Sequence, residues 1–187
     1  MMLWTRTGLL ACVAALSLGG SASAASYLAD LQRNAEQIRQ LPNTSEWDVD
    51  RNLSAQRQFD LAVADLNAQR YREAALRLNL LLQQSQDDAV LLTAYGLALE
   101  GLEQWTPAEQ AFTQALSHAH GLPKEQLVAQ RDRGVVRARL GRAAQAQADL
   151  DALQQRLATC GERCDQADDL RGAVDEVQRA IAAGPGG

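Results

Sequence analysis

A repeated spacing of small residues in the central part of the chain constrains its fold more than any other feature. The six residues of this pattern are Ala62 and Ala74, Gly96 and Ala108, and Gly134 and Ala146. Within each pair the two residues stand twelve positions apart; the second pair follows the first by thirty-four positions, and the third follows by thirty-eight. The four extra residues fall in the loop around 121–123, where insertions cost little free energy. Self-similarity at such a period indicates stacked copies of one supersecondary unit.

The middle copy, residues 88–120, shows what this unit is. Its first half, ending around 100–101, is apolar over more than half the circumference of a helix, so helical neighbours are expected on two sides. Its second half begins with Thr106, which predicts a helix cap, and Glu109 would complete a capping box. Pro107 suits the first turn of such a helix.

The two helices of the middle copy are expected to pack tightly against each other. Ala108, Phe112 and Ala115 form a small–large–small stripe, and Gly96 on the first helix leaves room for another helix to approach closely. A glycine inside a helix costs about 1 kcal/mol relative to alanine, which close packing can offset. Because one helical hairpin cannot bury its own apolar surface, the copies are expected to stack.

At these residues the sequence resembles the tetratricopeptide repeat (TPR) family, a thirty-four-residue helix–turn–helix with a small residue in each helix and an aromatic near the turn. Tyr71 takes the place of Trp105 in the first copy. The further matching residues are Leu78 and Leu81 in the first copy, and Leu150 and Leu153 in the third. The family's proline after the second helix is missing in the first copy and displaced to Pro123 in the second.

The resemblance covers roughly residues 53–157 and implies an all-α fold. The expected architecture is a right-handed α-solenoid of stacked helix-turn-helix repeats with flanking N- and C-terminal helices. Its three repeats would lie within residues 50–159, at about 55–88, 89–122 and 123–159.

The first 24 residues have the pattern of a cleaved signal peptide. Arg6 supplies the positive end, residues 9–18 the apolar run, and residues 22–24 a small-residue cleavage site. The apolar run is too short to span a bilayer comfortably, so we expect export, to the periplasm of a bacterium, without a transmembrane segment in the mature chain. An alternative stays open, because residues 9–12 resemble the lipobox of bacterial lipoproteins, which would anchor the chain in the outer membrane through Cys12.

Two cysteines remain once the leader is removed, and their spacing favours a disulfide. Cys160 and Cys164 enclose Gly161, which lets the chain turn so that the sulfurs can meet. A redox pair and a metal site are alternatives, although no βαβ setting or further ligand is visible. The disulfide would hold a C-terminal capping helix at 160–183 against the repeats, before a flexible tail at 184–187.

The flanking segments are expected to protect the two ends of the stack. Residues 25–49 predict an N-terminal helix over 26–41, which Pro42 ends, followed by a turn. In the C-terminal helix Asp165 is placed to cap the N-terminus, and one apolar face would close the solenoid.

Composition and motifs argue against several classes of function. Without Arg6 the chain keeps 17 basic residues against 23 acidic ones, a net charge of about −6, which disfavours nucleic acid as a partner. No phosphate-binding loop, nucleophile elbow or HExxH motif is present. His118 and His120, two apart at a helix end, would chelate a metal poorly, and Asp149 and Asp151 are expected to be solvated. We therefore expect no cofactor, no metal and no catalysis.

Binding of a protein or peptide is the function that the resemblance implies. In the TPR family the first helices of successive repeats line a concave groove, and mapping by spacing places eleven residues there: Phe59, Val63, Leu66, Asn67, Thr93, Leu97, Glu100, Val128, Arg131, Val135 and Arg139. Several are apolar, which favours an apolar or amphipathic segment over a charged tail. The sequence thus predicts an exported scaffold or accessory protein of an envelope assembly. The alternative is a self-associating structural protein, a homo-oligomer whose own N-terminal helix fills the groove.

Overall fold

The computed structural model describes residues 46–160 and 164–185, and side chains from residue 54 onward. Its helices in chain order are α2 (Glu46–Asn67), α3 (Tyr71–Leu82), α4 (Ala89–Gly101), α5 (Trp105–His118), α6 (Pro123–Arg139), α7 (Ala143–Cys160) and α8 (Ala167–Ala183). The described chain is entirely helical, as predicted. The predicted signal peptide, the helix at 26–41 and Cys12 lie outside the described residues.

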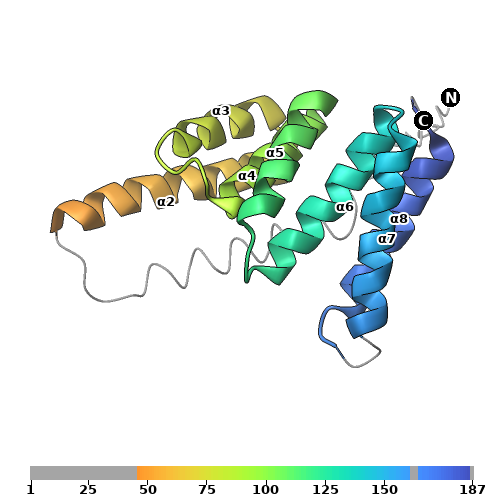
Figure 1. Ribbon diagram of the computed structural model, residues 1–187. Coiled ribbons are helices and arrows are strands. Elements are labelled where there is room, and N and C mark those ends of the chain that lie inside the picture. The colour runs from red at the N-terminus through yellow and green to blue at the C-terminus, as the bar shows by residue number, and fades with distance from the viewer. Residues whose placement is uncertain (1–45, 161–163, 186–187) are drawn as a thin grey trace, which may run out of the picture.

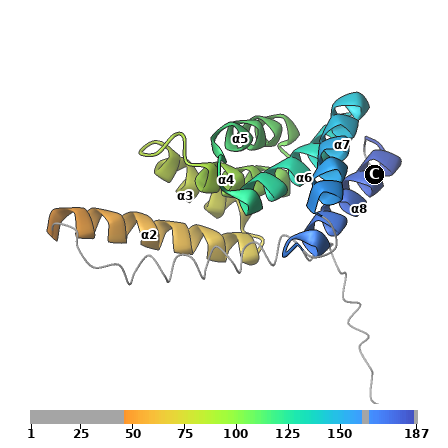
Figure 2. The same cartoon turned by 60° about the horizontal axis from the view of Figure 1, so that its bottom comes forward.

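Consecutive helices pack on one another to form a helical repeat stack (Figure 1). The second helices α3, α5 and α7 lie on one side of the stack, and α2, α4, α6 and α8 lie on the other (Figure 2). Each hairpin therefore contributes one helix to each of two layers. The added α8 continues the layer of first helices, where it packs against both α6 and α7.

The six repeated small residues are buried and let the helices come close. A Cβ atom built on Gly96 would lie only 2.5 Å from Cε1 of Phe112, which faces it from α5. At Gly134 a Cβ atom would lie 3.0 Å from Val177 of α8. The glycine positions are thus points of close helix approach, one within a hairpin and one toward the last helix.

The three hairpins turn in the same way, at positions that share the repeat spacing. Gln69, Glu103 and Gly141 have positive φ angles of 58°, 58° and 70°. The following amide nitrogens donate to carbonyl oxygens five residues earlier, over 2.8 Å, 2.9 Å and 2.8 Å, which completes a Schellman motif each time. Only the third turn has the glycine that a left-handed conformation favours.

Glu103→Gly is therefore expected to stabilise the protein by about 0.5–1 kcal/mol, and Gly141→Ala to destabilise it by a similar amount. The left-handed conformation costs a non-glycine residue about 1–2 kcal/mol, of which the greater chain entropy of unfolded glycine offsets a part. Urea unfolding of both variants would measure this, with Glu103→Gln as the control that leaves the strain in place. A loss of stability in Glu103→Gly would contradict the turn geometry.

Helix starts differ from the sequence prediction in three places. Helix α2 begins at Glu46, four residues before the expected start. Helix α5 begins at Trp105 after Gln104, without a side-chain cap, so the predicted cap at Thr106 is wrong. Helix α8 follows Gln166, also without a side-chain cap, so the role given to Asp165 is wrong as well. In contrast, Asp88 caps α4 by accepting hydrogen bonds from the amides of residues 90 and 91.

Candidate partner-binding surface

All eleven residues predicted to line a groove lie on the first helices α2, α4 and α6. Five of them are buried: Val63, Leu66, Thr93, Val128 and Arg131. Their side chains pack between helices, and the Thr93 hydroxyl donates to the carbonyl oxygen of Ala89 over 2.7 Å. These five have little surface for a partner in the described structure, and their place on a groove wall stays a prediction.

The other six predicted residues keep surface at which a partner could contact them. Asn67 is exposed, and the partly exposed residues are Phe59, Leu97, Glu100, Val135 and Arg139. Leu97 and Val135 occupy the same repeat position, which Val63 fills in the first hairpin. Leu97 packs against the apolar cluster formed mainly by the first two hairpins, Val135 packs against a separate cluster formed with α7 and α8, and both stay partly exposed.

Three of the predicted residues meet in a cluster of charges between α4, α6 and α8, which we call the acidic centre: Glu100, Arg131, Asp132, Arg139 and Glu176. Arg131, only 2% exposed, donates from Nε and Nη2 to the two carboxylate oxygens of Asp132 over 2.5 Å and 2.8 Å. Its Nε also lies 3.5 Å from a carboxylate oxygen of Glu176 on α8. A bidentate pair of this kind orients the buried guanidinium firmly.

Charges within the acidic centre change the proton affinity of its members. Desolvation alone would lower the pKa of Arg131. The pKa is nevertheless raised, because Asp132 accepts its hydrogen bonds and the negative charges of Asp132, Glu176 and Glu100 stabilise the guanidinium. Burial raises the pKa of Glu100 well above its usual value, and Asp132 and Glu176 add to the rise, while Arg131 and Arg139 oppose it. The negative charge of Glu100 is thus disfavoured by its burial and by the carboxylates beside it.

Substitution of Glu100 is expected to change how stability depends on pH. Because its pKa is higher in the folded protein, the folded state binds the proton more tightly than the unfolded chain, whose glutamate pKa is about 4.3. The free energy of unfolding should therefore fall as the pH rises from this value through the folded pKa. Glu100→Gln should remove the fall and be the more stable protein at neutral pH.

Urea unfolding at a series of pH values would measure this difference. Glu103→Gln, an exposed change three residues away, is the matched control and should keep the pH profile of the wild type. Identical profiles for Glu100→Gln and the wild type would contradict a poorly stabilised charge at Glu100.

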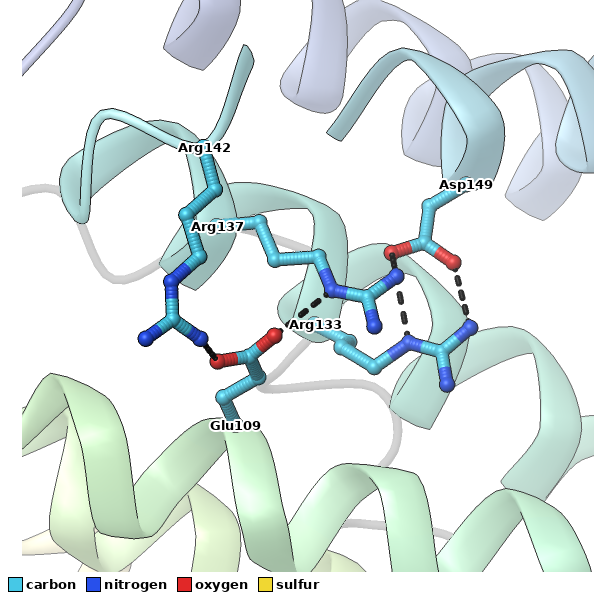
Figure 3. A network of polar contacts seen from close by, with 5 residues as sticks. All are labelled: Glu109, Arg133, Arg137, Arg142 and Asp149. Carbon is cyan, nitrogen blue, oxygen red and sulfur yellow. Dashed lines mark hydrogen bonds and ion pairs between the residues drawn. The ribbon is translucent and has the colours of Figure 1, made fainter. Parts of the chain in front are cut away.

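A second network of charges lies between α5, α6 and α7, where the second and third hairpins meet (Figure 3). Arg137 of α6 donates to Glu109 of α5 and to Asp149 of α7, over 2.8 Å in both cases. Arg133 adds two hydrogen bonds to Asp149, and Arg142 pairs with Glu109. The two carboxylates thus join three helices, and every charge in the network has an opposite charge beside it.

This network overturns two sequence predictions. Glu109 does not form a capping box, since it is buried and pairs with arginines of the next hairpin. Asp149 is not solvated, because only 2% of its side chain is exposed. The repeat register could have indicated that Asp149 is paired. Arg137 and Asp149 occupy the same repeat positions as Asp65 and Arg77, with the charges exchanged. Arg77 donates to Asp65 over 3.0 Å, whereas the middle hairpin has the apolar Leu99 and Ala111 there.

The remaining candidate residues have structural surroundings. Cys160 and Cys164 lie within disulfide-bonding distance, with Cα atoms 5.5 Å apart, as their spacing predicted. His118 lies 3.5 Å from Asp87, and both residues are exposed. Within the described residues, no group of three or more histidine, cysteine or acidic side chains is placed to hold a metal ion.

Comparisons with known proteins give no further guide to this surface. No family model, curated protein or solved structure matches the chain. No helix in the described part is both long and apolar enough to cross a bilayer.

Proposed function

We propose that this protein is a non-catalytic protein–protein interaction module, an exported TPR-like scaffold or accessory protein that works in an envelope assembly. It binds an apolar or amphipathic segment of its partner on the first-helix layer of α4 and α6. The observation that carries this proposal is the partial exposure of Leu97 and Val135 at one repeat position, directly beside the acidic centre. Apolar side chains with charged neighbours suit an amphipathic helix.

Export is supported by the sequence pattern of the leader and by the cysteine pair. Cys160 and Cys164 are placed to bond, and disulfides persist mainly in oxidising compartments such as the periplasm. Mass spectrometry of the natural N-terminus distinguishes cleavage near residue 24 from acylation at Cys12.

Crosslinking in the native envelope tests the binding surface. Leu97→Asp places a charge on the proposed surface and should abolish the recovery of specific partners. Leu122→Asp is the matched control, since it makes the same change in the loop before α6, where Leu122 is 38% exposed. Equal recovery of partners by Leu97→Asp and the wild type would reject the α4–α6 surface.

Self-association is a second candidate function, which the exposed leucines of the first hairpin favour. Leu76 and Leu80, one turn apart on α3, are 63% and 58% exposed. The other hairpins have glutamine or alanine at these positions, namely Gln110, Gln114, Ala148 and Ala152. Light scattering would detect an oligomer, and Leu76→Glu with Leu80→Glu should convert it to a monomer. A monomeric wild type would rule this candidate out.

A further inference from the structure

The third hairpin shows how charge joins one hairpin of this stack to the next. Glu109 of α5, in the second hairpin, accepts a hydrogen bond from Arg137 over 2.8 Å and pairs with Arg142. The third hairpin thus receives a carboxylate from the helix before it, through a face with an excess of arginines. This receiving face consists of the other four residues of Figure 3, namely Arg133, Arg137, Arg142 and Asp149.

The middle hairpin receives an uncharged residue instead. Ala75 of α3, which stands one repeat before Glu109, packs against the apolar cluster that contains Leu99 and Ala111. In both junctions the charge of the receiving face therefore suits the residue that enters it. The four residues of the middle hairpin at the positions of the receiving face are all uncharged, namely Tyr95, Leu99, Gln104 and Ala111.

The first hairpin has a receiving face as well, although the structure describes no hairpin before it. Its side chains are accessible: Leu61 is 41% exposed, Arg70 54% and Arg77 35%. Only Asp65 is buried. The four residues at the positions of the receiving face, which we call the outer face, are Leu61, Asp65, Arg70 and Arg77.

Two arginines of the outer face share one carboxylate. Arg70 donates from Nε and Nη2 to Oδ1 of Asp65, over 2.9 Å and 2.5 Å. Arg77 donates to Oδ2 of Asp65 over 3.0 Å, and to the side-chain oxygen of Gln58 over 2.9 Å. In the described part of the chain, no second carboxylate pairs with either arginine. Since an arginine has five N–H donors, each guanidinium keeps donors for a further acceptor.

Leu61 adds an apolar contact to these charges. The two residues to which Arg77 donates, Gln58 and Asp65, stand one turn before and one turn after Leu61 on α2. Leu61 therefore lies on the side of α2 that Arg77 reaches. In the middle hairpin its position is occupied by Tyr95, which packs against the apolar cluster. The outer face thus combines exposed apolar surface with a positive charge.

From this charge complementarity we propose that the outer face binds a helix of a partner protein, and that an aspartate or glutamate of this helix pairs with Arg70 and Arg77. The helix lies against α2 as α5 lies against α6, and apolar residues beside its acid contact Leu61. A basic helix is disfavoured, because it would add a like charge to the two arginines. The inference adds a second contact to the proposed function and does not depend on the α4–α6 surface.

A phage-displayed library of random linear peptides, selected on the full chain, tests the inference. Peptides that lose binding to Arg70→Glu should be enriched in aspartate or glutamate beside apolar residues. On the wild type, exchange of this acid for its amide should lower their affinity about tenfold, the loss expected for one charge-assisted hydrogen bond. Arg72→Glu, an exposed change on the same helix, is the matched control and should bind them as tightly as the wild type.

Arg70→Glu should also reverse the preference of the outer face. Peptides with lysine in place of the acid should bind this variant more tightly than they bind the wild type. The reversal distinguishes direct pairing from a loss of folding, because an unfolded variant would bind neither form of the peptide. Leu97→Asp should bind the acidic peptides unchanged, since Leu97 lies outside the outer face.

Three results would overturn the inference. The first is a selection in which the peptides lost by Arg70→Glu have no preference for acidic residues, or in which none is lost. The second is a wild-type oligomer that Arg70→Glu converts to a monomer in light scattering, which would identify a second copy of the chain as the occupant. The third is a photo-crosslink from p-benzoylphenylalanine in place of Leu61 to residues 26–41 of the same chain, which would identify an internal occupant.

Discussion

Asp149→Ala is expected to lower the free energy of unfolding by about 3 kcal/mol. Asp149 is 2% exposed and accepts hydrogen bonds from both Arg133 and Arg137 (Figure 3). Its removal leaves two largely buried guanidinium groups side by side with less opposite charge. Breaking a buried pair by removal of one partner typically costs about 3–5 kcal/mol, and the 16–17% exposure of these arginines favours the lower end of that range.

Urea unfolding would measure this loss, and Asp151→Ala on the exposed side of the same helix should change stability by less than about 0.5 kcal/mol. The double variant Arg137→Leu with Asp149→Ala gives the third hairpin the same residues that the middle hairpin has at these positions, Leu99 and Ala111. It should cost less than the sum of the two single changes, because apolar groups of the right shape can replace an ion pair. Simple additivity would show that the two side chains act independently.

Gly96→Ala is expected to destabilise the protein by about 1–2 kcal/mol, although alanine is the better helix former. The new methyl group would lie 2.5 Å from the ring of Phe112, which is fully buried and has little room to move. Overpacking of this kind costs about 1–3 kcal/mol, of which the gain in helix propensity, about 1 kcal/mol, recovers a part.

Gly172→Ala in α8 is the matched control, since no atom lies within 4 Å of a Cβ built there. It should raise the free energy of unfolding by about 1 kcal/mol, the propensity gain alone. A second test combines Gly96→Ala with Phe112→Leu, which recreates the Ala62 and Leu78 pair of the first hairpin. The double variant should be more stable than the sum of the two single effects predicts. Thermal unfolding of the wild type, Gly96→Ala, Phe112→Leu and the double variant would measure this. Stabilisation by Gly96→Ala would refute the close approach.

Much of the fold could be predicted from the sequence, since the repeat register is a local property of the chain. The apolar and small residues recur with the period of a helical hairpin, and each hairpin has to bury the same face. The all-α fold is confirmed, and Ala62, Gly96 and their counterparts are buried as expected. Cys160 and Cys164 are close because only three residues stand between them in the sequence.

The candidate surface was harder to predict, because spacing assigns a residue to a helix face but not to a depth. Arg131 lies on the predicted face, yet α8 approaches α6 so closely that the guanidinium is buried beside Glu176. Asp132 and Glu176 were not predicted members of the surface. Glu109 was assigned to a cap from a local motif, whereas its partners stand twenty-eight and thirty-three residues further along the chain.

The sequence by itself determined the helical class, the three-hairpin register and the small residues at which helices meet, because each of these depends on neighbours within one repeat. Only the tertiary structure decided which charges are buried and paired and which apolar residues remain in reach of a partner. Burial and electrostatic interaction depend on distances between helices that are remote in sequence. These distances depend on how whole side chains pack against each other. The spacing of residues in a repeat does not determine that packing.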